Sequence, residues 1–220
     1  MKNKTKENQE PYGLDNSHGH PGHAKARIGM WLFLFTEVLL FGGLFLLYSV
    51  YRSNFPEDFH FCANNLDTLM GALNTLILLT SSLTMVLAAA NLERKNRKYA
   101  AIFLSATILF GLLFLVNKYI EWSAKIGHGF YPNSEVLQQH TAGENIFYSL
   151  YYLMTGLHGL HVLIGIVLLT VMLFLVRKTG KANPEEELDR LNIKVENSGL
   201  YWHLVAVIWI FLFPLFYLIT

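Results

Sequence analysis

The sequence predicts an all-α polytopic membrane protein with five transmembrane helices. Of its 220 residues 53% are apolar, and the mean hydropathy is +0.33. The polar residues gather in the first 27 positions and in four short connections. The apolar runs between them have about 20 residues or more, enough to cross a hydrocarbon core about 30 Å thick. The predicted spans are residues 28–50, 67–90, 99–122, 145–176 and 200–219.

The distribution of basic residues predicts the orientation of these spans. Fourteen Lys and Arg residues lie in the segments 1–27, 91–98 and 177–199, against two in 51–66 and 123–144. Basic connections stay in the cytoplasm, so the N-terminus is predicted to be cytoplasmic and the C-terminus outside. Residues 1–27 are predicted to form a flexible polar tail before one membrane domain, 28–220. The net charge of +1 gives no reason to expect a nucleic-acid partner.

The first span contains one acid, Glu37, close to the middle of the membrane. A carboxylate there costs about 2.5 kcal/mol or more, so Glu37 should face the bundle interior and find a partner. His158 and His161 are three residues apart in the fourth span and share a face. We predict a buried polar network of these three residues, with Glu37 hydrogen-bonded to one of the two histidines. Glycines beside the histidines, at 156, 159 and 165, would let another helix approach.

The other spans contain secondary polar positions. Asn74 is expected to form an interhelical hydrogen bond. Lys118 and Glu121 are an i, i+3 pair, and Lys118 is expected to extend towards the membrane surface. Amphipathic aromatic rings are common at membrane interfaces, so a cluster of them predicts that the last span begins at the interface. Such a cluster could also contact a lipid headgroup. The residues concerned are Tyr201, Trp202 and His203.

No reaction centre is evident from the residues alone. Two histidines at i, i+3 can ligate one ion, but they cannot supply both faces of a haem. The Gly/Pro-rich tail holds His18, His20 and His23, which can grip a metal ion, although such tails are more often mobile arms. The single cysteine excludes an intrachain disulfide and a cysteine cluster. Residues 183–188 (NPEEEL) predict a short cytoplasmic helix, with Asn183 at the cap and Pro184 at the first helical position.

Four stretches, in order, resemble subunit III of the haem–copper cytochrome c oxidases. They are residues 29–37 (GMWLFLFTE), 73–82 (LNTLILLTSS), 155–165 (TGLHGLHVLIG), and 199–203 (GLYWH) continuing to Trp209. The family's full form has seven helices, so five helices resemble its shorter bacterial members. Where the family usually has an aspartate, this sequence has Ala206.

The resemblance implies a non-catalytic accessory subunit of a terminal oxidase in the bacterial cytoplasmic membrane. The oxidase would reduce oxygen to water and pump protons, with cytochrome c or quinol as the electron donor. Subunit I would be the main partner and would carry the haems and copper, with no cofactor in this chain. Other oxidase subunits and membrane phospholipids are further implied partners, and Glu37 carries over as the family's buried glutamate. Two alternatives remain: an accessory subunit associated with nitric-oxide reductase, and a haem-binding anchor using His158, His161 and His203.

Overall fold

A computed structural model describes residues 21–132, 134–178 and 184–218, which form helices joined by short turns. The elements follow in the order α1 (Pro21–Asn54), α2 (Pro56–Asn64), α3 (Thr68–Glu93), α4 (Arg97–Gly127), α5 (Glu135–Gln138), α6 (Ala142–Lys178), α7 (Pro184–Phe213) and the π-helical turn η1 (Pro214–Leu218). Within the described residues, five helices are long and apolar enough to cross a membrane. The predicted fold class and the number of spans are therefore confirmed.

The helices run further than the apolar runs that predicted them. The largest difference is in α7, which begins at Pro184 and continues into the last span as one helix. A helix does begin at Pro184, the predicted first helical position, but it is not short: residues 184–188 are the start of α7, and the predicted cap residue Asn183 lies outside the described residues. No proline interrupts residues 185–213, and a single glycine, Gly199, is tolerated in a helix interior at a cost of about 1 kcal/mol. Pro214, which lacks an N–H donor, coincides with the change from α7 to η1.

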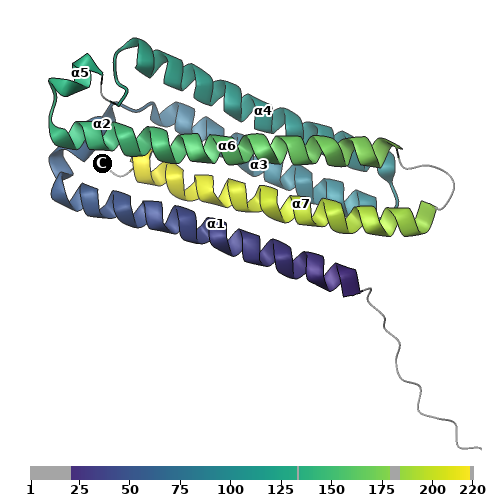
Figure 1. Ribbon diagram of the computed structural model, residues 1–220. Helices are drawn as coiled ribbons and strands as arrows, with labels where there is room; N and C mark the ends of the chain where they lie inside the picture. The colour runs from purple at the N-terminus through teal and green to yellow at the C-terminus, as the bar shows by residue number, and fades with distance from the viewer. Residues whose placement is uncertain (1–20, 133, 179–183, 219–220) are drawn as a thin grey trace, which may run out of the picture.

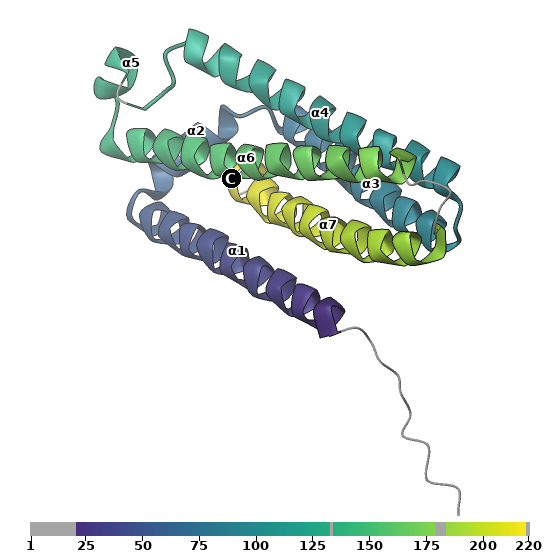
Figure 2. The same ribbon diagram turned by 45° about the vertical axis from the view of Figure 1, so that its right-hand side comes forward.

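Four helices form a compact bundle, and α1 lies at its side. Helices α3, α4, α6 and α7 pack against one another along their lengths. Helix α1 contacts α6 and α7 from Phe33 to Tyr48 and diverges from the bundle towards its N-terminus (Figure 1; Figure 2). In the most apolar segment of α1, 11% of the residues are buried, against 50% in the last span. Helix α1 is therefore a peripheral element.

The two ends of the bundle differ. At one end, called here the α2 end, α1 turns through the short helix α2 into α3, whose first turn is capped by Asp67 Oδ1 accepting from the Met70 N–H at 3.0 Å. At the other end, called the basic end, α3 and α6 finish and α4 and α7 begin (Figure 1).

Aromatic side chains fill the core, and small residues make room for them. A Cβ atom on Gly165 would lie 2.8 Å from the Trp202 ring, and one on Gly111 would lie 2.7 Å from it. Both glycines therefore let α4 and α6 approach the indole on α7. By contrast, a Cβ on Gly159 would meet no atom within 4 Å, and one on Gly156 would meet the Trp122 side chain at 3.0 Å. Of the three glycines expected to admit another helix, Gly165 has that role most directly.

Candidate functional site

The acid of the first span meets a histidine of α6. A heptad-like stripe on α1, with Leu34, Phe41 and Tyr48 buried and Glu37 partly buried, faces α6 and α7. On this stripe Glu37 Oε2 lies 2.8 Å from His161 Nε2, with 13% and 10% of the two side chains exposed. The contact has the distance of an ion pair, but no aligned hydrogen bond reaches Oε2. The pair thus joins the peripheral helix to the bundle by a short electrostatic contact.

The second nitrogen of His161 constrains where the proton lies. Nδ1 is 2.7 Å from the backbone oxygen of Leu157, which accepts but cannot donate, so Nδ1 carries a hydrogen. Nε2 is therefore the nitrogen that His161 presents to Glu37. The ring of Phe41 stands edge-on to His161 with centroids 5.5 Å apart and covers the pair.

His158 lies elsewhere in the bundle and does not contact Glu37. Its ring is completely buried between Phe114 and Trp209, with centroids 5.4 and 5.2 Å away. Neither ring nitrogen has a hydrogen-bond partner among the described residues. The sequence pattern placed both histidines on one face, but a face of α6 is wide enough for His161 to meet α1 while His158 turns between α4 and α7.

A second polar site lies closer to the α2 end, where α4, α6 and η1 meet. Lys118 Nζ donates to Glu121 Oε2 at 2.9 Å, to the Tyr151 hydroxyl at 3.2 Å and to the Tyr217 hydroxyl at 2.9 Å. Both tyrosine hydroxyls in turn donate to Glu121 Oε1, at 2.6 and 2.5 Å. All three ammonium hydrogens and both carboxylate oxygens are therefore used within this cluster, which is called here the Lys118 cluster.

Lys118 does not extend to the membrane surface, as its sequence position suggested. It is 7% exposed, and its ammonium also lies 5.1 Å from the ring centroid of Trp209. Lys118 stays buried because an ion pair, two hydroxyl groups and aromatic rings compensate the free-energy cost of burying its charge. Sequence reasoning missed Tyr151 and Tyr217. No local spacing points to them, because they lie 33 and 99 residues from Lys118 in the sequence.

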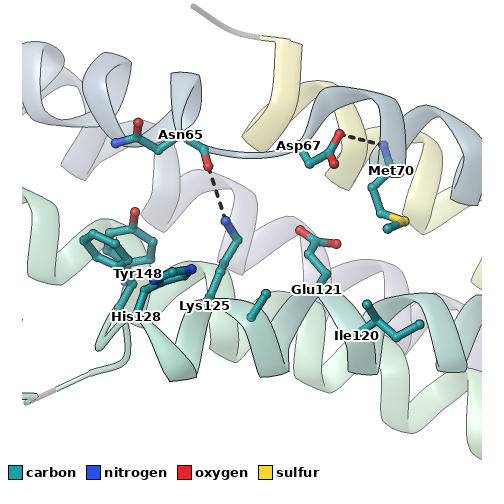
Figure 3. A pocket seen from close by; sticks show the side chains of 10 residues that line it. Asn65, Asp67, Met70, Ile120, Glu121, Lys125, His128 and Tyr148 are labelled. Carbon is teal, nitrogen blue, oxygen red and sulfur yellow. Dashed lines mark hydrogen bonds between the residues drawn. The ribbon is translucent and has the colours of Figure 1, made fainter.

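Glu121 also borders a cavity at the α2 end (Figure 3). The cavity has a volume of about 260 Å³, and its polar lining includes Asp67, Glu121, Lys125 and His128. Figure 3 shows Glu121 and Lys125 on one side of α4, directed across the cavity towards the segment between α2 and α3, where Lys125 Nζ donates to the Asn65 backbone oxygen at 3.4 Å. The Lys118 cluster therefore borders this cavity through Glu121.

The remaining predicted polar residues form hydrogen bonds or close contacts between helices. Asn74 is fully buried on α3, and its Oδ1 accepts from Asn117 Nδ2 on α4 at 3.1 Å. The Tyr201 hydroxyl donates to the backbone oxygen of His161 at 3.0 Å, and His203 Nδ1 lies 2.6 Å from Ser82 Oγ.

Tyr201 and Trp202 are buried between helices rather than exposed on the surface of the bundle. They are 3% and 1% exposed, and Trp202 Nε1 donates to Ser81 Oγ at 3.0 Å. Helix α7 begins at Pro184, ahead of the predicted start of the span at 200. These rings therefore lie well inside the helix, where Gly165 and Gly111 admit the indole.

No group of three or more His, Cys, Asp or Glu side chains able to hold a metal ion occurs within residues 28–132, 134–178 and 190–218, whose side chains the structure describes. The tail histidines at 18, 20 and 23 lie outside these side chains. The structure contains two polar sites that join spans: the contact of Glu37 with His161 and the Lys118 cluster.

A bundle with five membrane-spanning helices and two buried polar sites defines a class: multi-pass membrane proteins that hold ionisable groups between packed helices. Residues 11–220 match the family described as cytochrome c oxidase subunit III, and the chain belongs to this family. Cytochrome c oxidase subunit 3 of Synechocystis is 32% identical over 94% of this chain and 82% of that protein.

Two further relatives widen the comparison. Cytochrome bo(3) ubiquinol oxidase subunit 3 of Buchnera aphidicola is 26% identical over 92% of this chain and 91% of that protein. A haem–copper oxidase subunit I+III of Aeropyrum pernix is 30% identical over 89% of this chain, which covers 23% of that longer protein. The relatives therefore include subunits of both cytochrome c and ubiquinol oxidases, and a protein whose name combines subunits I and III.

Proposed function

We propose that this chain is a non-catalytic accessory subunit of a haem–copper terminal oxidase. In this function it stabilises subunit I and supports proton uptake during oxygen reduction. Haem and copper belong to the partner subunits, and the complex lies in the bacterial cytoplasmic membrane with the N-terminus of this chain in the cytoplasm. The observation that carries the proposal is the family match over nearly the whole chain. The subunit I+III relative supports subunit I as the partner.

We further propose that Glu37 and His161 have a structural function in this subunit. Helix α1 exposes large apolar side chains over most of its surface, among them Trp31, Leu39 and Leu46 at 62%, 59% and 71%. In the oxidase this surface faces lipid or a neighbouring subunit, so the orientation of α1 matters for assembly. The contact with α6 sets that orientation, and His158 fills the core between α4 and α7. The Lys118 cluster holds α4, α6 and η1 together as a rigid support.

Purification of the complex through an affinity tag on this chain tests the proposal. The expected result is a complex that contains haem and copper, together with subunit I identified by mass spectrometry. The same chain expressed without its partners should bind no haem. Stoichiometric haem retained by the isolated chain would instead favour the haem-anchor alternative, and copurification with a nitric-oxide reductase would assign the chain to that complex.

A further inference from the structure

A basic groove lies at the basic end of the bundle, away from both polar sites. It runs between the first turns of α4 and the last turns of α6 and has a volume of about 710 Å³. Three cationic side chains line it, Arg97 and Lys98 from α4 and Arg177 from α6. Lys98 and Arg177 are both exposed, with Lys98 in the first turn of α4 and the Arg177 side chain extended along the groove. An anion entering here would meet positive charge from two helices.

The backbone adds to this attraction. Arg97 and Lys98 are the first two residues of α4, and the Asn96 side chain makes no capping hydrogen bond to the helix. The amide N–H groups of a first helical turn have no partner within the helix, and the helix dipole adds positive potential at that position. Phosphate groups are bound at such helix N-termini, particularly where cationic side chains converge on them.

The groove also has an apolar wall beside its cationic side chains. Ile102 is 59% exposed on this wall, whereas Val176 forms part of the lining with only 2% of its surface exposed. Arg177 reaches back along the groove to Ser105, with Nη2 3.4 Å from the Ser105 Oγ. At 1.5 Å per residue, Ser105 lies about 12 Å along α4 from Arg97, well into the span. A ligand that fits this groove carries a negative headgroup and an apolar chain.

We propose that the groove formed by Arg97, Lys98, Arg177, Ile102 and Val176 binds an anionic phospholipid from the leaflet at the basic end. The phosphate lies between Lys98, at the first turn of α4, and the Arg177 side chain, and an acyl chain lies against the exposed Ile102. Basic pockets between transmembrane helices on the positively charged side of membrane proteins bind anionic headgroups of this kind. The site does not depend on the oxidase assignment, because its lining comes from this chain alone.

The test uses the full chain, in its native complex or alone, in nanodiscs of phosphatidylcholine with a small fraction of phosphatidylglycerol. Native mass spectrometry measures how much phosphatidylglycerol is retained. Because each Lys or Arg near a membrane surface contributes about 1 kcal/mol of attraction, Lys98→Gln with Arg177→Gln should lower retention by about tenfold or more. Lys178→Gln is the matched control: Lys178 neighbours Arg177 but lies over the Phe174 ring, 5.7 Å from its centroid, and does not line the groove.

A second arm separates a lipid from free phosphate. Ile102→Asn should weaken phosphatidylglycerol retention while leaving any competition by inorganic phosphate unchanged. The single variant Lys98→Gln, at an exposed position, should still lower retention if the double variant folds poorly. Equal loss in Lys178→Gln and in the groove variants, no loss in the groove variants, or full displacement of the lipid by millimolar inorganic phosphate would overturn the proposal.

Discussion

The two polar sites within the spans differ in how they compensate the burial of ionisable side chains. The Lys118 cluster is closed: side chains from α4, α6 and η1 satisfy one another, with 8% of the Lys118 and 4% of the Glu121 side chain exposed. The pair of Glu37 and His161 is open: two side chains, each exposed by 10% or more, connect a peripheral helix to the bundle. The first site is part of the core, and the second attaches a helix to it.

This difference indicates what each site contributes. A buried charge whose partner is removed is strongly destabilising, whereas an interhelical contact at the edge of a bundle contributes modestly. The Lys118 cluster should therefore determine whether the bundle folds. The contact of Glu37 with His161 should determine where α1 lies relative to a folded bundle.

The largest effect is expected from removing one partner of the Lys118 cluster. Lys118→Met leaves the buried Glu121 carboxylate without its cation and should lower the free energy of unfolding by about 3–5 kcal/mol. Denaturant titration in mixed micelles measures this change. Lys118→Met combined with Glu121→Gln removes both charges and should recover part of the loss. If the double variant is as unstable as the sum of the two single variants, the cluster is not coupled as described.

The next effect concerns the α6–α7 contact at Gly165, one helical turn from His161. Gly165→Ala would place a Cβ 2.8 Å from the buried Trp202 ring, and such overpacking should cost about 1–3 kcal/mol. Gly159→Ala is the matched control, because its Cβ would meet nothing within 4 Å and alanine favours the helix. The melting temperatures of the two variants should move in opposite directions or differ clearly. Equal shifts would mean that Trp202 is not held against Gly165.

A smaller effect is expected from the α1 contact. Glu37→Leu removes the partner of His161 Nε2 and should weaken α1 docking by about 0.6–2 kcal/mol while the rest of the bundle keeps its stability. Glu37→Gln keeps a donor for Nε2 and should have less effect. Phe45 and Phe211, whose rings lie 6.2 Å apart, give the reporter: cysteines at these positions in a Cys62→Ala background should be cross-linked less efficiently by a short dithiol reagent in Glu37→Leu. Unchanged cross-linking would contradict the attachment function.

The smallest effect concerns Cys62 in α2, outside the spans. Burial, with smaller contributions from Glu144 and Asp58, raises the pKa of the Cys62 thiol to about 12. The folded state therefore holds this proton more tightly than the unfolded state, so the thiol's contribution to stability falls as pH rises from about 9 to 12. Maleimide labelling at pH 8 should be slow until denaturant is added, and the stability difference between the protein and Cys62→Ala should shrink across that pH range. Rapid labelling of the folded protein would show that α2 does not bury the thiol.

The sequence predicted the number of spans because hydropathy reports directly on membrane burial. The ends of the helices were less predictable, because a helix such as α7 includes polar residues that lie outside the apolar run. Glu37 stood out because a lone acid in an apolar run needs a partner. Its contact with His161 rather than His158 depends on which helices pack together, which local spacing does not specify. Tyr151 and Tyr217 were hidden because tyrosine is ordinary in membrane helices, and 66 residues separate the two.

Two matched double-mutant cycles in the same micelles test the account most directly. One cycle combines Lys118→Met with Glu121→Gln, and the other combines Glu37→Leu with His161→Leu. We predict a coupling energy in global unfolding of about 2–3 kcal/mol for the first cycle and below about 1 kcal/mol for the second. A coupling energy for Glu37 and His161 equal to or larger than that of Lys118 and Glu121 would contradict the distinction between a core cluster and a helix attachment.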